Sequence, residues 1–596
     1  MEQEPAQLPD TIAVPRTDPI YNCHAYLTKI PIGAIQPFIE TFTKPGDIVV
    51  DFFAGSGMTG LAASILNRRA RLSDISVLGK HIYTGYLINA PSQEIRGAAD
   101  RVLAAARKSV GKLYMTKRRS DGAEVEMIRT IWSFTYLCPS CEKSMVYYDA
   151  LCAQDRVPQH CPSCGGPFAR RSWPRDIDLP MKVVVQGENG RQIEQDVGDT
   201  DRHSLHEALK DKRLRKLPSL PISEDREMFS RSGLRRSGMT ETGKFFSPRN
   251  GIALVELWRL INEIEDEAIR QQLRFAFTAI LPRASMRYQW SAKRPLNAQN
   301  QTYYIAPVYF EWNVFDLFSR KVNAVIRANE VFPQSDDMLQ VEKLSDVSYE
   351  VLSAEKLAHL DDHSVDYVFT DPPFGSNIFY SDMNLFQEAW LGETTDHSRE
   401  AVVHTTGKRK QGSSKRYEDL LRSAFSEAFR VLKPTRYMSV VFGNSSGRIW
   451  GLVQRALRDA GFEASPVHIA ILDKGQRSVK GLNSGSERVC TVDLILTVQK
   501  PSESEKSKSA VLLANGDVNS MVGAVAKELP INQAFNPSHV YARVLRKAIQ
   551  NGLVLDDLHL GEVMIALRNA GYGVDQKTGL LYTETNRNGK KRRKAA

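Results

Sequence analysis

The sequence has no apolar stretch long enough to cross a membrane, and it has few cysteines. A bilayer span needs roughly 18 consecutive apolar residues, and no run approaches that length. The first residues, Met-Glu-Gln-Glu-Pro, have neither the basic nor the apolar region of a secretory signal. Seven cysteines in 596 residues are too few for a disulfide scaffold. We therefore expect a cytoplasmic protein that makes no contact with a membrane.

The composition excludes collagen-like and wholly disordered chains. Hydrophobic residues make up 42% of the sequence and charged residues 25%, which is ordinary for a globular protein with several buried cores. At roughly 150 residues per domain, the length predicts about four structural units. Lysine and arginine number 79 against 69 aspartates and glutamates, giving a net charge of +10. This excess suits a polyanionic partner without requiring one.

Two separated segments show the alternation of strands and helices that is typical of an α/β sheet. The first has a predicted strand, a glycine turn, a helix and a second strand, at residues 47–51, 52–57, 59–66 and 70–74. The second has predicted strands at 365–370, 437–442 and 492–498, and predicted helices at 417–432 and 447–460. Residues 111–345 do not continue this alternation, so we interpret them as an insertion into one sheet.

The turn after the first strand has the features of a nucleotide site. Gly55 and Gly57 let the backbone approach a ligand, and the N-terminus of the following helix faces that ligand. Asp74 follows Asp51 by 23 residues, close to the spacing of about 20 at which a carboxylate meets ribose hydroxyls. Residues 55–60 also satisfy the G-x-G-x-x-G fingerprint of NAD and FAD enzymes. The setting favours another cofactor, because the string from residue 51 to 60 resembles the S-adenosylmethionine loop of DNA amino-methyltransferases.

A second motif, Asp371-Pro372-Pro373-Phe374, follows a predicted strand and projects into the same crevice. Methylation of an exocyclic amine needs a nitrogen lone pair that is freed from ring conjugation, and accepting both amine protons frees it. The Asp371 carboxylate and the Pro372 carbonyl are the natural acceptors, since consecutive prolines have no competing N–H groups. Phe374 offers a flat face to an extruded base. Taken alone, the motif is also compatible with a purely structural turn.

Together the two motifs are similar to those of the N6-adenine and N4-cytosine DNA methyltransferases. In that superfamily, Asp at the first position of the tetrapeptide is more typical of adenine enzymes, and Ser of cytosine enzymes. Residues 28–31 and 38–46 look like the segment that precedes the cofactor loop and helps to hold the methionine end. Residues 380–390 and the cysteine pairs further resemble adenine-specific DNA methylases that contain a zinc ribbon. The resemblance covers residues 21–500.

The resemblance implies an α/β protein with a Rossmann-like class I methyltransferase sheet, S-adenosylmethionine as cofactor and double-stranded DNA as partner. It assigns catalysis to Asp371, Pro372, Pro373 and Phe374. It assigns cofactor binding to ten residues, which are Thr28, Lys29, Asp51, Phe52, Ala54, Gly55, Ser56, Gly57, Thr59 and Asp74. One departure is visible: many relatives have a carboxylate at the end of the third strand, near the cofactor adenine, where this sequence has Leu352-Ser353-Ala354.

Four of the seven cysteines form two Cys-x-x-Cys pairs. Cys138 and Cys141 are separated by 19 residues from Cys161 and Cys164, which matches the spacing of a four-cysteine zinc ribbon. Since four thiolates leave no open coordination position, the predicted Zn²⁺ is structural. His160 and Cys152 lie close by in sequence, and we interpret both as ordinary residues.

Basic and aromatic segments lie between the two motifs. The basic residues of 210–236 are suited to neutralising phosphates, or else form a solvated surface. We predict that the aromatic residues of 288–312 belong to a core rather than to a platform for stacking bases. The basic tail at 590–594 either binds phosphates or has no role.

The leading hypothesis is methylation of adenine N6 in DNA, by base flipping and direct transfer. The alternatives are N4-cytosine methylation, methylation of RNA or a protein amide, and a DNA-binding subunit of a modification or phage-defence complex with partner proteins. The 5-methylcytosine mechanism is disfavoured because the sequence contains no Pro-Cys dipeptide for its nucleophile. We expect the protein to associate with the nucleoid. The predicted organisation begins with an arm at residues 1–20 and a first methyltransferase part at 21–110. An insertion follows at 111–345, with a zinc ribbon at about 135–168 and a candidate target-recognition region. A second methyltransferase part at 346–500, a linker at 501–509 and a helical C-terminal unit at 510–596 complete the chain.

Overall fold

The structure is a computed structural model. It describes residues 8–14, 17–88, 90–154, 157–291, 302–331, 346–462, 466–473, 492–502, 514–515, 518–529, 535–575 and 580–583.

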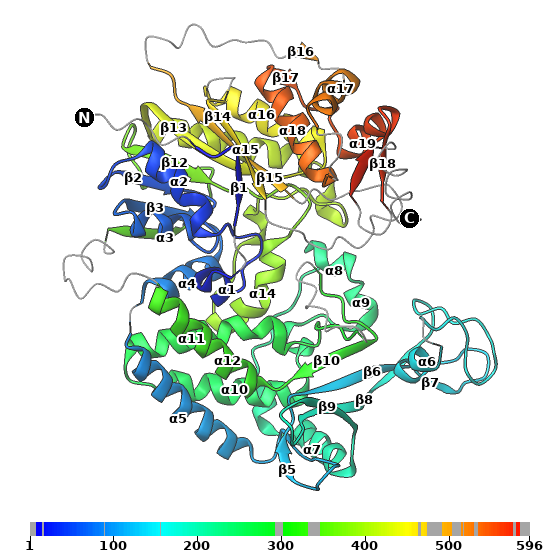
Figure 1. Ribbon diagram of the computed structural model, residues 1–596. Coiled ribbons are helices and arrows are strands. Elements are labelled where there is room, and N and C mark those ends of the chain that lie inside the picture. Colours follow the sequence, from blue (N-terminus) through cyan, green and yellow to red (C-terminus); the bar gives the residue numbers. More distant parts are fainter. Residues whose placement is uncertain are drawn as a thin grey trace, which may run out of the picture.

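An eight-stranded sheet lies in the upper half of the view in Figure 1. Its strands, in chain order, are β1 (Thr11–Ala13), β2 (Ile48–Asp51), β3 (Arg69–Asp74), β11 (Val347–Val351), β12 (Val365–Thr370), β13 (Leu432–Phe442), β14 (His468–Asp473) and β15 (Val492–Gln499). In space they follow the order β1-β14-β15-β13-β12-β2-β3-β11. Neighbours are parallel except at β15, which runs antiparallel to both β13 and β14. The chain turns from one half of the sheet to the other between β2 and β12, where ligands bind in α/β sheets.

The strands and helices predicted for this part are confirmed, with shifted ends. The helices that accompany the sheet are α1 (Pro19–Cys23), α2 (Ile32–Phe42), α3 (Met58–Ile65), α4 (Val77–Leu87), α14 (Tyr380–Leu391), α15 (Ser413–Val431) and α16 (Gly447–Asp459). The predicted helix at 417–432 and the predicted strand at 437–442 leave Pro434 in a break between them, but β13 already begins at Leu432. The strand tolerates this proline because its pairing with β12 shifts register there, and an irregular stretch needs no N–H from residue 434.

The chain between the two halves of the sheet forms a helical body and a second, antiparallel sheet. The helices are α5 (Ser92–Val110), α7 (Asp199–Lys210), α8 (Glu227–Arg231), α9 (Leu234–Ser237), α10 (Pro248–Asn262), α11 (Glu267–Ala284) and α12 (Val314–Val331). α5, which ends at the boundary predicted near residue 110, packs against α10, α11 and α12. The predicted aromatic core is confirmed for five residues, since Tyr288, Tyr303, Tyr309, Phe310 and Trp312 are all buried.

The antiparallel sheet carries the cysteine pairs at its far end. Its strands lie in the order β10-β6-β8-β9, with β7 paired to β6. They are β6 (Arg129–Leu137), β7 (Ser144–Val146), β8 (Arg175–Gln186), β9 (Gln192–Asp196) and β10 (Val308–Trp312), beside the short pair β4 (Met115–Lys117) and β5 (Glu124–Glu126). In Figure 1 the ribbon of β6 and β8 extends away from the helical body, with β7 and α6 (Tyr147–Gln154) at its tip.

The C-terminal part packs on the large sheet through α18 (Pro537–Gln550), which contacts β14 and β15. Its other elements are α17 (Val518–Glu528), α19 (Leu560–Asn569) and the short strand pairs β16 (Ala514–Asn515) with β17 (Leu553–Val554) and β18 (Tyr572–Val574) with β19 (Leu581–Thr583). Most of the predicted linker, residues 503–509, and the basic tail at 590–594 lie outside the described residues. Among the described helices, none is both long enough and apolar enough to cross a membrane.

Candidate functional site

A cavity of about 900 Å³, counting the space open to solvent, lies at the carboxyl ends of β2, β3, β11 and β12. Its wall contains eleven of the predicted site residues, which are Thr28, Lys29, Asp51, Phe52, Ala54, Gly55, Ser56, Thr59, Asp74, Asp371 and Pro373. Ser353 and Ala354 line it too, so the segment that lacks the usual carboxylate faces the cavity. Gly57, Pro372 and Phe374 adjoin the wall in sequence without lining it.

The two glycines of the first motif are required by neighbouring side chains as well as by backbone conformation. Gly57, the residue before α3, has φ of 77°, and a Cβ there would lie 2.1 Å from Cδ2 of Tyr83. Gly55 has φ of 50°, and its Cβ would lie 2.9 Å from Cε1 of Tyr26. Any other residue at either position would therefore combine an unfavourable backbone with a steric clash.

Asp51 is a buried carboxylate that ties β2 to its neighbours. It accepts hydrogen bonds from Oγ1 of Thr59 (2.7 Å), Oγ1 of Thr370 (2.8 Å) and the backbone N–H of Phe53 (3.1 Å). Burial raises the pKa of Asp51 to about 7, although the two threonine hydroxyls act in the opposite direction. These contacts fix the end of β2, the start of α3 and the end of β12 relative to one another.

Asp74 holds the glycine loop from the neighbouring strand. One of its oxygens accepts the N–H of Gly55 (2.8 Å) and the other the N–H of Ser76 (2.9 Å). Burial raises the pKa of Asp74, against the effect of these N–H donors. The carbonyl of Gly55 accepts a hydrogen bond from the hydroxyl of Tyr349 on β11 (2.7 Å).

Two residues of this loop support were not predicted. Tyr349 reaches Gly55 across 294 positions of sequence. Gly79 in α4 lies so close that a Cβ there would be 2.3 Å from the carbonyl oxygen of Gly55. No periodicity or spacing signals such contacts, because they exist only once β11 and α4 have packed beside the loop.

Residues 26–30, which precede α2, line the cavity, and we call this segment the strap. Thr28 has φ of 56°, an unusual value for a β-branched residue, and its Oγ1 shares a 2.5 Å hydrogen bond with the hydroxyl of Tyr380. The ring of Tyr26 stacks on that of Tyr380, with centroids 6.0 Å apart. Lys29 lines the cavity, but its ammonium donates to the carbonyl of His24 (2.6 Å), and burial lowers its pKa to about 7.

The carbonyls of the Asp-Pro-Pro-Phe segment are held from several sides. The hydroxyl of Tyr417 donates to the carbonyl of Pro373 (2.6 Å), and Nδ2 of Asn444 donates to that of Phe374 (3.0 Å). No donor to the Pro372 carbonyl is found among the residues that the structure describes. The half-buried ring of Phe374 packs edge to face against Phe442, with centroids 5.0 Å apart.

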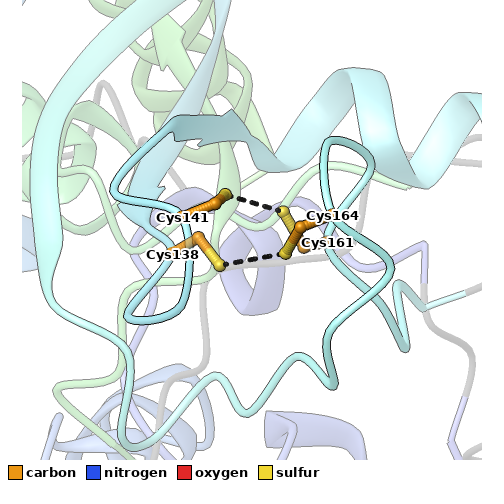
Figure 2. Close-up of side chains that lie close together, drawn as sticks. All are labelled: Cys138, Cys141, Cys161 and Cys164. Carbon is orange, nitrogen blue, oxygen red and sulfur yellow. Dashed lines mark hydrogen bonds between the residues drawn. The ribbon is translucent and has the colours of Figure 1, made fainter.

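The four cysteines of the insertion converge at the tip of the β6–β8 ribbon, as Figure 2 shows. Their sulfur atoms all lie within 4.8 Å of one another, with Cys138 to Cys164 at 3.7 Å and Cys141 to Cys161 at 3.9 Å. A tetrahedral site with Zn–S bonds of about 2.3 Å has sulfur atoms about 3.8 Å apart. The donor set therefore fits Zn²⁺.

Comparisons with known proteins find methylases. The family model described as "DNA methylase" matches residues 9–95. The "Putative methylase YubD" of Escherichia coli (strain K12) is 52% identical over 42 residues, which are 7% of this chain and 18% of that protein. The chain thus matches less than a fifth of the length of this relative.

Solved structures with weak similarity include a "Putative DNA Modification Methylase" from Thermus thermophilus. One such chain is 19% identical, with 27% of this chain and 59% of that chain covered and a TM-score of 0.16. Another, complexed with S-adenosyl-L-methionine, is 16% identical, with coverages of 33% and 71% and the same TM-score.

Proposed function

We propose that this protein, whose residues 9–95 match the DNA methylase family, transfers a methyl group from S-adenosylmethionine to the N6 amine of adenine in double-stranded DNA. The observation that carries the proposal is the single cavity into which both motifs open. Gly55, Asp74 and Asp371 line the same cavity, although about 300 residues separate Asp371 from the other two in sequence. A cofactor and an amine bound there would meet.

The sheet supports this reading. Seven of its strands, in the order β11-β3-β2-β12-β13-β15-β14 with β15 antiparallel, fit a Rossmann-like class I methyltransferase sheet. On this proposal residues 21–110 and 346–500 form the methyltransferase domain and residues 111–345 the insertion. Residues 1–20 are its arm, 501–509 a linker and 510–596 a separate C-terminal unit.

The cofactor residues would act mainly by holding the glycine loop open to the ligand. S-adenosylmethionine, when bound, supplies a methyl group on a sulfonium. A carboxylate has about four lone-pair sites, so Asp74 can accept ribose hydroxyls while it holds Gly55 and Ser76. Thr28 and Lys29 reach the cavity on the strap, where the ammonium of Lys29 is turned to His24 and leaves its backbone to face the ligand.

In the same cavity, Asp371 and the Pro372 carbonyl would accept the two amine protons. The next two carbonyls, those of Pro373 and Phe374, accept hydrogen bonds from Tyr417 and Asn444. The carbonyl of Pro372 would therefore accept from the substrate. Phe374 would stack on the extruded base with the part of its ring that Phe442 does not cover. Aspartate at the first position favours adenine over cytosine. The Cys138, Cys141, Cys161 and Cys164 site would hold a structural Zn²⁺ that stiffens the end of the β6–β8 ribbon.

The test combines labelled cofactor with two variants. Purified protein is incubated with methyl-labelled S-adenosylmethionine and unmethylated duplex DNA, and the DNA is digested to nucleosides that are identified by mass spectrometry. We expect labelled N6-methyladenine with the parent and with Asp361→Ala, which removes an exposed carboxylate ten residues away. We expect no label with Asp371→Ala, although that variant still binds the cofactor.

Other outcomes would refute the proposal in distinct ways. Label in N4-methylcytosine would retain the enzyme class and change the base. Binding of cofactor without label in DNA would point to an RNA or protein substrate, or to a subunit that needs a partner. Unchanged labelling in Asp371→Ala would remove this residue from the chemistry.

A further inference from the structure

An open groove lies between α8 and α9 on one wall and the short 3-10 helix η4 (Lys408–Lys410) on the other. It measures about 980 Å³ when the space open to solvent is counted. Arg235 and Arg236 line the first wall, and Gly407 and Lys408 line the second. We call this the basic groove. Neither motif of the proposed function includes any of its residues.

Positive charge is in excess around the basic groove. The exposed side chains of Arg235, Arg236 and Lys408 line the groove. Two more exposed basic residues, Arg231 and Lys410, lie on the helices α8 and η4 of its walls, and the exposed Arg399 lines the cavity. Arg235 is paired with Glu224, whereas Lys408 and Lys410 pair with no carboxylate in the described part of the chain. Another open groove of the molecule differs in this respect, because its lining contains Glu126, Glu188 and Asp316 beside Arg118.

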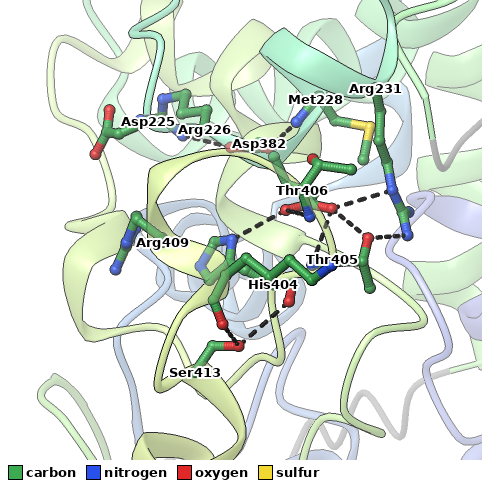
Figure 3. Close-up of polar contacts among 12 residues, drawn as sticks. Asp225, Arg226, Met228, Arg231, Asp382, His404, Thr405, Thr406, Arg409 and Ser413 are labelled. Carbon is green, nitrogen blue, oxygen red and sulfur yellow. Dashed lines mark hydrogen bonds and ion pairs between the residues drawn. The ribbon is translucent and has the colours of Figure 1, made fainter.

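A buried carboxylate fixes one wall of the basic groove to the other. Glu227, whose side chain is fully buried, accepts hydrogen bonds from Thr405 Oγ1 (2.6 Å) and from the N–H groups of Thr405 (3.2 Å) and Thr406 (3.3 Å). It also contacts His404 (3.2 Å) and Arg231 (3.2 Å). Figure 3 shows residues 404–406 gathered beside α8 in this network. The lysines of η4, which follow directly, are therefore held close to α8 and α9.

The same network anchors the groove to the cavity. The carboxylate of Asp382 in α14 accepts hydrogen bonds from Nη1 of Arg226 (3.0 Å) and from the N–H of Met228 at the start of α8 (2.9 Å). Tyr380 and Ser381, the residues before Asp382, line the cavity. One helix thus carries cavity residues and the contact that positions α8.

The two sites are close enough for one duplex to reach both. Arg399 lines the cavity, and Lys408 lies nine residues further along the chain. Nine extended residues span at most about 32 Å, and the folded path is shorter. One turn of B-DNA is about 34 Å long, so phosphates within a turn of a base in the cavity can lie at the groove.

The cysteine-bearing ribbon also adjoins this surface. Nη1 of Arg236 donates to the carbonyl of Arg171 (2.8 Å), seven residues beyond Cys164. Nη1 of Arg170 donates to the hydroxyl of Tyr304 (2.8 Å). The segment that leaves the cysteine site is therefore bonded to the wall of the basic groove, and its arginines add to the same charge.

We propose that the basic groove holds the sugar–phosphate backbone of double-stranded DNA next to the target base. The proposal rests on the proposed function, since it supplies that substrate with a path into the cavity. Lys408 and Lys410 each neutralise a phosphate, and Glu224 opposes the contact. The groove gives affinity without reading sequence, because phosphates are the same in every base pair.

The experiment measures the affinity for a duplex oligonucleotide at several salt concentrations. Each phosphate contact contributes about 0.9 to the slope of log K against log salt, so Lys408→Ala with Lys410→Ala should lower the slope by about 1.8. The matched control is Arg101→Ala with Lys108→Ala, which removes two exposed charges from α5 and should leave the slope unchanged. Both proteins should bind S-adenosylhomocysteine like the parent.

A third variant tests the groove through a gain that misfolding cannot produce. Glu224→Gln removes the carboxylate paired with Arg235, so DNA binding should tighten several-fold at low salt and lose this advantage at high salt. Equal slopes for the groove variant and the control, or no gain with Glu224→Gln, would refute DNA binding by the basic groove. The proposed function would stand in that case, provided that the parent methylates DNA. If the parent binds no duplex DNA, the proposed function falls together with the groove.

Discussion

Gly79 offers a direct test of how the cofactor loop is supported. A Cβ at this position would lie 2.3 Å from the carbonyl oxygen of Gly55 and 2.5 Å from the hydroxyl oxygen of Tyr349. Even close carbon–oxygen contacts in proteins are about 3.3 Å long, so Gly79→Ala must displace α4 or the loop by about 1 Å. Since the added Cβ meets both partners of the 2.7 Å hydrogen bond from Tyr349 to Gly55, we expect the displacement to break this bond.

The magnitudes follow from this displacement. Loss of the hydrogen bond costs about 1 kcal/mol, which weakens the affinity for S-adenosylhomocysteine about 5-fold before any change in loop shape is added. Overpacking costs about 1–3 kcal/mol of stability, and the better helix propensity of alanine returns up to about 1 kcal/mol. We therefore expect a folded variant whose free energy of unfolding falls by no more than about 3 kcal/mol.

The assay is calorimetric titration with S-adenosylhomocysteine, together with urea unfolding. The matched control is Gly33→Ala in α2, where nothing lies within 4 Å of the added Cβ. It should keep the parent's affinity and gain up to about 1 kcal/mol of stability. If Gly79→Ala binds the ligand with the parent's Kd, the loop does not depend on this close packing and the reasoning is wrong.

Three further predictions concern other parts of the molecule. Cys161→Ser should lose the bound zinc, as measured by elemental analysis, and residues 138–173 should become sensitive to protease. The affinity for S-adenosylhomocysteine should not change. Retention of one zinc per chain would contradict this prediction. Tyr417→Phe removes the hydroxyl that donates to the Pro373 carbonyl, and we expect methyl transfer to slow about 10-fold. The Kd for S-adenosylhomocysteine should not change. If the variant keeps the parent's rate, Tyr417 does not position the Asp-Pro-Pro-Phe segment. Burial lowers the pKa of His81 from 6.5 to about 4. As the pH is lowered, the imidazole is therefore protonated in the unfolded chain before it is protonated in the folded one. The free energy of unfolding should consequently fall by about 3 kcal/mol between pH 6.5 and pH 4. The measurement is urea unfolding of His81→Gln and of the parent at pH 7 and pH 4.5. The variant should lack the contribution of His81 to the loss of stability. An equal loss in both proteins would contradict the prediction.

The sequence was sufficient for features that depend on near neighbours. The strands at 70–74 and 365–370, the glycine turn and the paired cysteines are each written in a few consecutive residues, because strand alternation, left-handed backbone and metal-ligand spacing are local properties. The prediction that the aromatic residues form a core also held for five of them, since large aromatic side chains are rarely left exposed.

Tertiary structure decided which residues do what at the site. Lys29 was predicted from the resemblance to contact the cofactor, yet its ammonium is turned to His24. The need for glycine at Gly57 comes in part from the ring of Tyr83, a contact that no local pattern reveals. The basic groove brings residues 231–236 together with residues 407–410, which are far apart in sequence. Their charges form one surface only because Glu227 binds the loop at residues 404–406 through Thr405. Contacts of this kind depend on how strands and helices are ordered in space, and a linear pattern of residues specifies that order only through the packing of the whole chain.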